Sequence, residues 1–141
     1  MSVASRLRIL GLVAAACCFA GTATLASAAP HRGAGGIHIL NTKNLTDIPG
    51  KQAVMLTLEV PPGGSSPAHR HDAHVWVYVL DGTFITQVKG KPKETLHKGQ
   101  WFYEGPNDIH EVSANGSSTR PLKLLIFMIK NQGKPLTMPA K

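Results

Sequence analysis

Short runs of alternating apolar and polar residues, each ended by glycine or proline, limit the fold of this chain more than any other feature. Such alternation is typical of strands with one buried face, and helical periodicity is scarce. The 14 Gly and 10 Pro are spread along the chain and mark turns between the runs. Runs predicted as strands are 53–60, 75–80, 83–88, 93–97, 101–103, 109–113 and 122–129. This spacing predicts an all-β sandwich or barrel.

Two turns between these runs carry further expectations. Asp81-Gly82 predicts a hairpin joining 75–80 to 83–88, because Asp-Gly favours tight two-residue turns. Four lysines (Lys89, Lys91, Lys93 and Lys98) surround the following turn. They are interpreted as a strand edge protected against aggregation, rather than as an anion-binding patch. No aromatic residues are interleaved with them, which argues against nucleic-acid binding.

The N-terminus has the layout of a secretory signal peptide. Arg6 and Arg8 precede the apolar run 9–20, and Ala26-Ser27-Ala28 supplies small residues for cleavage after Ala28. The apolar run is too short to favour an uncleaved membrane anchor. Acylation of a cysteine within the run is a weaker alternative, because apolar residues continue beyond it. We therefore expect an exported protein, periplasmic or secreted, with no stable membrane insertion after cleavage.

Removal of this signal changes what the remaining chain contains. We expect a signal at 1–28, a lead-in with a short strand at 29–48, a barrel at 49–130, and a tail at 131–141 along the surface or frayed. The formal net charge of +7 for the whole chain falls by the two signal arginines. Both cysteines leave with the signal, so the exported domain has no disulfide and no thiolate ligand. Any metal must bind to nitrogen or oxygen.

Histidines are the residues most suggestive of chemistry. His69 and His71 are two positions apart, so in a strand both imidazoles point to one face. Neutral imidazole is the commonest metal ligand in proteins. His110 follows the turn at 105–108 and is suited to supply a third ligand from elsewhere in the chain. An isolated pair of this kind is more often part of a solvated loop. Whether His69 and His71 are metal ligands therefore depends on the surrounding sequence pattern.

That pattern resembles the first motif of the cupin superfamily, Gly-(x5)-His-x-His-(x3,4)-Glu-(x6)-Gly. The chain has Gly63-(x5)-His69-x-His71-(x3)-Val75-(x6)-Gly82. The resemblance covers roughly residues 50 to 130 and implies a single-domain jelly-roll β-barrel of six to eight strands. It also implies one divalent transition metal at the barrel mouth.

The second motif, Gly-(x5)-Pro-x-Gly-(x2)-His-(x3)-Asn, is matched less fully. The chain has Gly99-(x5)-Gly105-x-Asn107-(x2)-His110, and its proline and final asparagine are each shifted by one place. The resemblance therefore rests here mainly on Gly99 and His110. Carried over position by position, it makes His69, His71 and His110 the metal ligands.

Val75 stands where the family has its glutamate, and a valine side chain binds no metal. His74, next to Val75, would point to the face of the strand opposite His69 and His71. Its side chain would reach the metal only through a bulge at 72–73. Otherwise His74 lies at the rim, where we predict a catalytic role as a proton acceptor. A further alternative is that Glu104 or Glu111 contributes to the site, but each is adjacent to an inward position and is expected to face outward.

A site of three neutral histidines keeps the full charge of a divalent metal and favours an anionic, chelating substrate. It also favours Fe, with Ni, Cu or Zn as alternatives, over Mn. Resemblance to three-histidine cupin dioxygenases implies an oxygenase acting on a small molecule such as a β-diketone or a thiol. The alternative is a cupin that binds a metal or small ligand without turnover, as the missing glutamate suggests.

Trp76 and Tyr78 have the opposite parity to Val75 and Val77. They are expected either to pack in an outer layer or to form a dimer contact. Cupins often dimerise, so a homodimer is a possible assembly.

Overall fold

The computed structural model describes residues 36–140, and the predicted signal segment lies outside this range. These residues form eleven β-strands. The strands are β1 (Ile37–Asn44), β2 (Lys51–Val60), β3 (Ser65–Ser66), β4 (His69–Arg70), β5 (Ala73–Asp81), β6 (Thr83–Val88), β7 (Glu94–His97), β8 (Trp101–Glu104), β9 (Ile109–Asn115), β10 (Leu122–Asn131) and β11 (Met138–Pro139). Within residues 36–140 no helix has the length and apolar character needed to cross a membrane.

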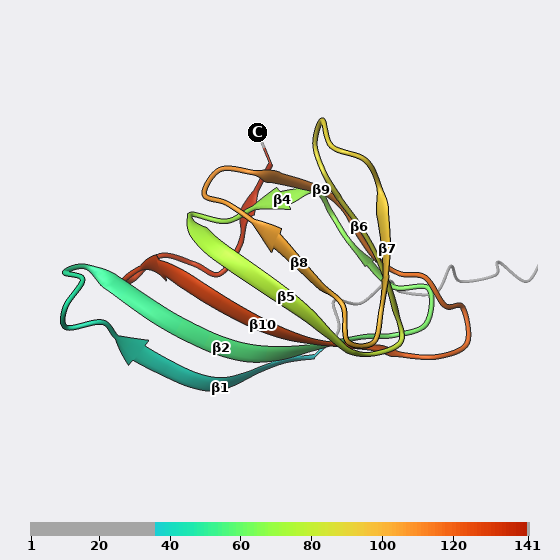
Figure 1. Cartoon of the computed structure of the whole chain (residues 1–141), viewed down its shortest axis with the longest axis horizontal. Helices are drawn as coiled ribbons and strands as arrows, with labels where there is room; N and C mark the ends of the chain where they lie inside the picture. The colour runs from blue at the N-terminus through green and yellow to red at the C-terminus, as the bar shows by residue number, and fades with distance from the viewer. Residues whose placement is uncertain (1–35, 141) are drawn as a thin grey trace, which may run out of the picture.

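The strands form two antiparallel sheets that face each other (Figure 1). The first, sheet A, has the order β1-β2-β10-β5-β8. The second, sheet B, has the order β11-β4-β9-β6-β7, with β3 also paired to β9. The two sheets converge at one end of the molecule and separate at the other (Figure 1). The all-β prediction and the jelly-roll type are confirmed, although the eleven strands of the described residues exceed the six to eight expected.

The core lies between the sheets because the strands alternate as the sequence predicts. In β5, Val75, Val77 and Val79 are buried, while the residues between them are exposed. Buried apolar side chains of β2, β6, β7, β8 and β10 complete the same cluster. Burial of such side chains is the main favourable contribution to folding, at about 1.5 to 3 kcal/mol each.

The Asp81-Gly82 turn is not the hairpin that the sequence predicts. β5 pairs with β10 and β8, whereas β6 pairs with β7 and β9, so the chain crosses from sheet A to sheet B at this turn. Gly82 has a φ of 90°, and a Cβ there would lie 2.8 Å from the carbonyl oxygen of Pro121. The glycine thus permits a sharp corner against a neighbouring segment. Local turn chemistry does not reveal which sheet the next strand joins.

Aromatic side chains cover part of the outer face of sheet A. Trp76 and Tyr78 on β5 are 38% and 43% exposed, and Trp101 and Tyr103 on β8 lie opposite them in register. Trp76 also packs against Tyr103 and Phe127, with ring centroids 5.2 and 5.9 Å away. Trp76 and Tyr78 therefore form an outer layer, one of the two expected arrangements. A dimer contact there stays a prediction.

Candidate metal centre

Two of the three predicted histidine ligands are brought together by strand pairing. β4 is only two residues long and pairs antiparallel with β9, and His69 lies directly opposite His110 in this register. Residues directly opposite each other in an antiparallel pair project from the same face. The ring centroids of the two histidines are 4.9 Å apart as a result. The turn before β9 contains Asn107 with a φ of 70°, a left-handed conformation that asparagine tolerates.

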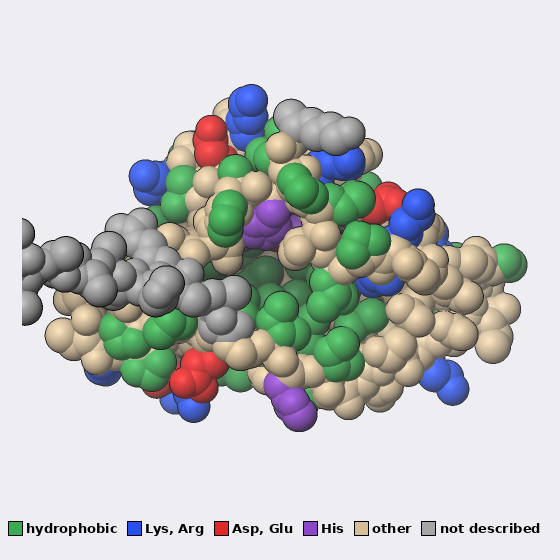
Figure 2. Space-filling model, turned by 180° about the vertical axis from the view of Figure 1, so that it is seen from behind, with side chains coloured by type: hydrophobic (Ala, Val, Ile, Leu, Met, Phe, Trp, Pro, Cys, Tyr) green, Lys and Arg blue, Asp and Glu red, His purple; other side chains and the backbone are tan. Residues whose placement is uncertain are grey.

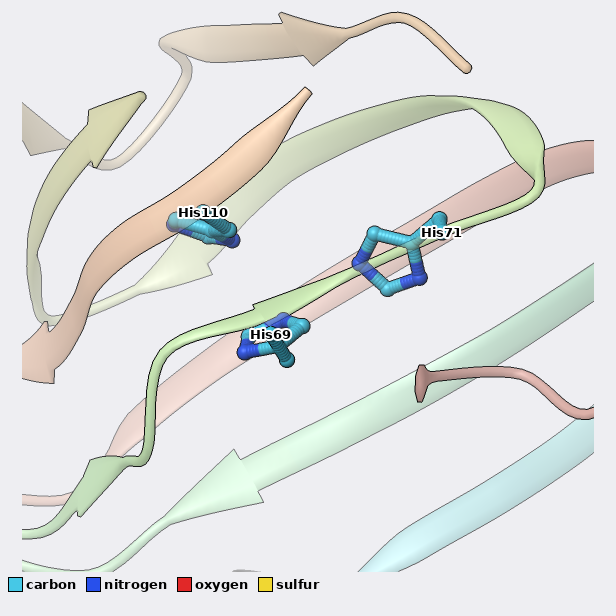
Figure 3. Close-up of side chains that lie close together, drawn as sticks. All are labelled: His69, His71 and His110. Atoms are coloured by element: carbon cyan, nitrogen blue, oxygen red, sulfur yellow. The ribbon is translucent and has the colours of Figure 1, made fainter. Parts of the chain in front are cut away.

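His71 completes the group from the segment that follows β4. Its ring lies edge-on to that of His69, with centroids 5.0 Å apart. One nitrogen from each of the three rings lies within 4.8 Å of the others, a spacing suitable for a shared metal ion. Figure 3 shows His69 on β4, His71 on the adjoining segment and His110 on β9. His71 and His110 are buried and His69 is half-buried.

Each ring is oriented by a hydrogen bond from one of its nitrogens. Nδ1 of His69 donates to the carbonyl of Pro67 at 2.9 Å, and Nδ1 of His71 donates to the carbonyl of Leu136 at 2.6 Å. Because a carbonyl only accepts, Nε2 of each ring keeps its lone pair when the imidazole is neutral. Nε2 of His110 is bonded to the hydroxyl of Thr86 at 2.8 Å, which leaves Nδ1 for another partner. Metal-binding histidines are held in this way in many proteins.

Glu104 is the residue of the site that the sequence interpretation misplaced. It was expected to face outward, but it is 1% exposed and lines the same cavity as the three histidines. Its Oε1 lies 3.4 Å from Nε2 of His71 and 3.2 Å from Nδ1 of His110. Glu104 is two positions after Phe102 on β8, so the two side chains point to the same face, and both are buried. This alternation is the sequence signal that could have placed Glu104 inward. Glu111 is exposed, as expected.

The electrostatics of the site show how closely these groups interact. Burial disfavours the charged form of Glu104, but the contacts with His110 and His71 outweigh it and lower the pKa of this carboxyl to about 2. Burial also disfavours a charged His71, yet Glu104 outweighs this and raises the pKa of that imidazole. At His69, burial dominates and lowers the pKa, which favours the neutral form that binds metals.

Two buried polar atoms of this site lack the hydrogen-bond partners that buried atoms normally have. Oε2 of Glu104 and Nδ1 of His110 are both buried and make no hydrogen bond. Such atoms are rare in folded proteins because each costs about 1 to 3 kcal/mol of lost hydration. A metal ion would use these lone pairs. The residues present therefore fit a bound divalent metal.

The histidines stand at the edge of an apolar cavity of about 410 Å³. Figure 2 shows this hollow lined with hydrophobic side chains, with a histidine at its margin. Its walls include Leu58 of β2, Val77 of β5 and Ile126 of β10. None of the described residues that line it is a lysine, an arginine, an aspartate or a tyrosine. The cavity thus combines one polar end with walls that favour apolar groups.

The C-terminal tail forms one wall of this cavity. β11 pairs with β4, so that Pro139 lies opposite His69. Leu136 packs against the core, and its carbonyl holds the ring of His71. We expected this segment to lie along the surface or fray, whereas residues 138–139 pair with β4. Leu136 and Met138 alternate as strand residues do, and this was the one available signal.

His74, the predicted catalytic residue, lies away from the three histidines. It is exposed on the outer face of β5, where its Nδ1 bonds to the hydroxyl of Tyr103 at 2.7 Å. The chain does pass from sheet B to sheet A at Asp72, but this passage does not turn His74 inward. Val75 is buried beside the cavity, as its parity predicts.

The sequence of this chain matches the family model described as Cupin domain over residues 56–128. This match covers just over half of the chain, and it includes all three histidines of the site. The chain belongs to the cupin family. No curated protein matches it.

Solved structures show the same fold at low sequence identity. The DMSP lyase DddQ of Ruegeria pomeroyi DSS-3 is 16% identical with a TM-score of 0.62, over 80% of this chain and 55% of that protein. An uncharacterized Klebsiella pneumoniae protein with a double-stranded β-helix domain is 15% identical with a TM-score of 0.59, over 80% and 90% of the two chains. A cupin domain from Bordetella pertussis is 20% identical with a TM-score of 0.52, over 70% and 96%. This chain thus spans about half the length of the DMSP lyase.

Proposed function

We propose that this chain is an exported, mononuclear metal-binding cupin with a dioxygenase-like activity on a small chelating substrate. The observation that carries the proposal is the group of three histidines with metal-ligand spacing at one end of an apolar cavity. His69, His71 and His110 would hold the metal, with Fe expected first and Ni, Cu, Zn or Mn as alternatives. When bound, the metal would supply Lewis-acid and redox chemistry at the cavity's polar end.

The walls of the cavity define the class of substrate. The apolar side chains of β2, β5 and β10 that line the cavity favour a substrate that is apolar over most of its surface. The volume of the cavity suits a small organic molecule. A substrate carboxylate would find no lysine or arginine among the described lining residues. We therefore infer a mainly apolar substrate with one chelating end, such as a β-diketone or an enol. His74 has no part in this proposal because it is on the outer face.

The alternative function is a cupin that binds a metal or a small ligand without turnover. It is favoured by the shortage of acid–base groups around the cavity. Apart from Glu104 and the three histidines, the polar side chains that line its described part are serines and one threonine. A reaction that needs a separate general base would lack one. An oxygenase depends less on a separate general base, because its reaction takes place between the metal, the substrate and oxygen.

Metal analysis of the purified protein, followed by an oxygen-consumption assay, tests the proposal. We expect a stoichiometric metal in the wild-type protein and none in His110→Ala. Less than stoichiometric uptake from Fe, Ni, Cu, Zn and Mn would overturn the metal function. The Fe-loaded protein is then given a panel of diketones, thiols and enols. Oxygen consumption with a panel member supports the enzyme, and none across the panel favours the binding protein.

A further inference from the structure

Glu104 occupies the place from which the missing motif glutamate would act. The cupin motif has its glutamate where this chain has Val75, on β5. In the pairing of β5 with β8, Val75 lies directly opposite Glu104. Opposed residues of an antiparallel pair have their Cβ atoms about 5 Å apart on one face of the sheet. A carboxylate on β8 at this register therefore reaches the region that a carboxylate at position 75 would reach.

Glu104 is not one of the three residues grouped by metal-ligand spacing, but its carboxylate contacts two of them, His71 and His110. Its Oε1 lies between Nε2 of His71 and Nδ1 of His110, at 3.4 and 3.2 Å. Both nitrogens are the ones left over after each ring has bonded to its orienting partner. The donor atoms of the two histidines thus face the carboxylate and not the protein surface.

The burial of Glu104 favours a positively charged partner. A carboxylate that is 1% exposed has lost almost all of its hydration, which is costly without a charged partner. Among residues 36–140, its ion-pair partners are His71 and His110, and no lysine or arginine contacts it. Both of these histidines are assigned to the metal and would then be neutral. The second oxygen, Oε2, is buried with no hydrogen-bond partner.

We propose that Glu104 is the fourth protein ligand of the metal, so that the carboxylate of the cupin site has moved from β5 to the adjacent strand β8. This inference rests on the proposed metal function. With a divalent metal bound, a site of three neutral histidines and one carboxylate has a net charge of +1. The same site without the carboxylate would have a net charge of +2. It also adds a hard oxygen donor, which favours Mn and Fe more than a site of three nitrogens does.

Titration of the metal-free protein with Zn(II), and with Co(II) as an optical probe, tests this assignment. In Glu104→Gln we expect Zn(II) affinity to fall by more than about 100-fold, since even residues that only orient a metal ligand contribute about 10- to 100-fold. The visible spectrum of bound Co(II) should also change, because its intensity and band positions report the donor set. Glu111→Gln is the matched control. It neighbours His110 but is exposed, and it should match the wild-type protein in both measurements.

A double variant that returns the carboxylate to β5, Val75→Glu with Glu104→Val, provides the second test. We expect it to regain Zn(II) affinity to within about tenfold of the wild-type value. Recovery would show that position 104 acts as a ligand and not through packing. Circular dichroism and thermal melting of each metal-free variant establish that it is folded.

The outcomes separate this inference from the proposed function. A wild-type protein that binds neither Zn(II) nor Co(II) would overturn the metal function itself. A wild-type protein that binds them, with a Glu104→Gln variant of equal affinity and identical Co(II) spectrum, would overturn the inference alone. A weakened Glu104→Gln variant with an unchanged Co(II) spectrum would also overturn it, because Glu104 would then only orient the histidines.

Discussion

Sheets A and B face the same cavity but line it with different chemistry. Sheet B and the segment after β4 supply the three histidines, together with Thr86, which orients one of them. Sheet A supplies apolar side chains from its long strands β2, β5 and β10, and one carboxylate from its edge strand β8. Metal binding thus depends on residues of sheet B and on the one carboxylate of sheet A, whereas the shape of the substrate space depends on the apolar side chains of sheet A. Mutations of these two sets of residues should affect the two properties separately.

The largest expected effect on metal affinity comes from a ligand of sheet B. His69→Ala removes one of three imidazoles and should reduce Zn(II) affinity by more than about 100-fold, beyond what loss of an orienting residue causes. Isothermal titration of the metal-free protein measures this. His38→Ala, on an exposed position of β1, is the matched control and should bind as the wild-type protein does. Equal affinities for the two variants would remove His69 from the site.

A smaller loss is expected when sheet B keeps its ligands but one of them is less well oriented. Thr86 is fully buried, and its hydroxyl holds Nε2 of His110 at 2.8 Å. Thr86→Val preserves the shape and deletes this bond, so Zn(II) affinity should fall by about 10- to 100-fold. Thr95→Val, at an exposed position of β7, should leave affinity unchanged. An unchanged affinity in Thr86→Val would mean that packing alone orients the ring.

Apart from Glu104, the cavity-lining residues of sheet A should affect stability more than metal affinity. Leu124 of β10 is 1% exposed and lines the cavity, so Leu124→Ala should lower the free energy of unfolding by about 3 kcal/mol. Chemical denaturation of the metal-free protein measures this loss. Zn(II) affinity of the folded variant should stay within a few-fold of wild type, because no ligand is touched. Leu125→Ala, on the other face of the same strand and half-buried, should cost less. A loss of affinity comparable to that of Thr86→Val would show that the two sheets are coupled.

The contrast between the sheets also explains what could be predicted from sequence. Alternation identified most of the longer strands, and the spacing of His69, His71 and His110 identified the histidine group, because both patterns are local or match a motif. Glu104 was misplaced because parity with Phe102 places it inward only once the buried face of β8 is known, and that face depends on the non-local pairing of β8 with β5. The corner at Gly82 was mistaken for a hairpin for the same reason. The tail reaches the site only because β4 offers it an edge to pair with.

The smallest effect is expected at His74, which lies on sheet A but on its outer face. Its ring is exposed and makes one side-chain hydrogen bond, to the hydroxyl of Tyr103. His74→Ala should therefore leave Zn(II) affinity at the wild-type value and lower the free energy of unfolding by at most about 1 kcal/mol, the usual contribution of one hydrogen bond. Its neighbour Val75 faces the cavity, so Val75→Ala is the informative comparison and should cost more stability through the space it leaves. Loss of metal in His74→Ala would mean that the face of β5 carrying His74 points into the cavity. The side chain of Val75 would then point away from Glu104.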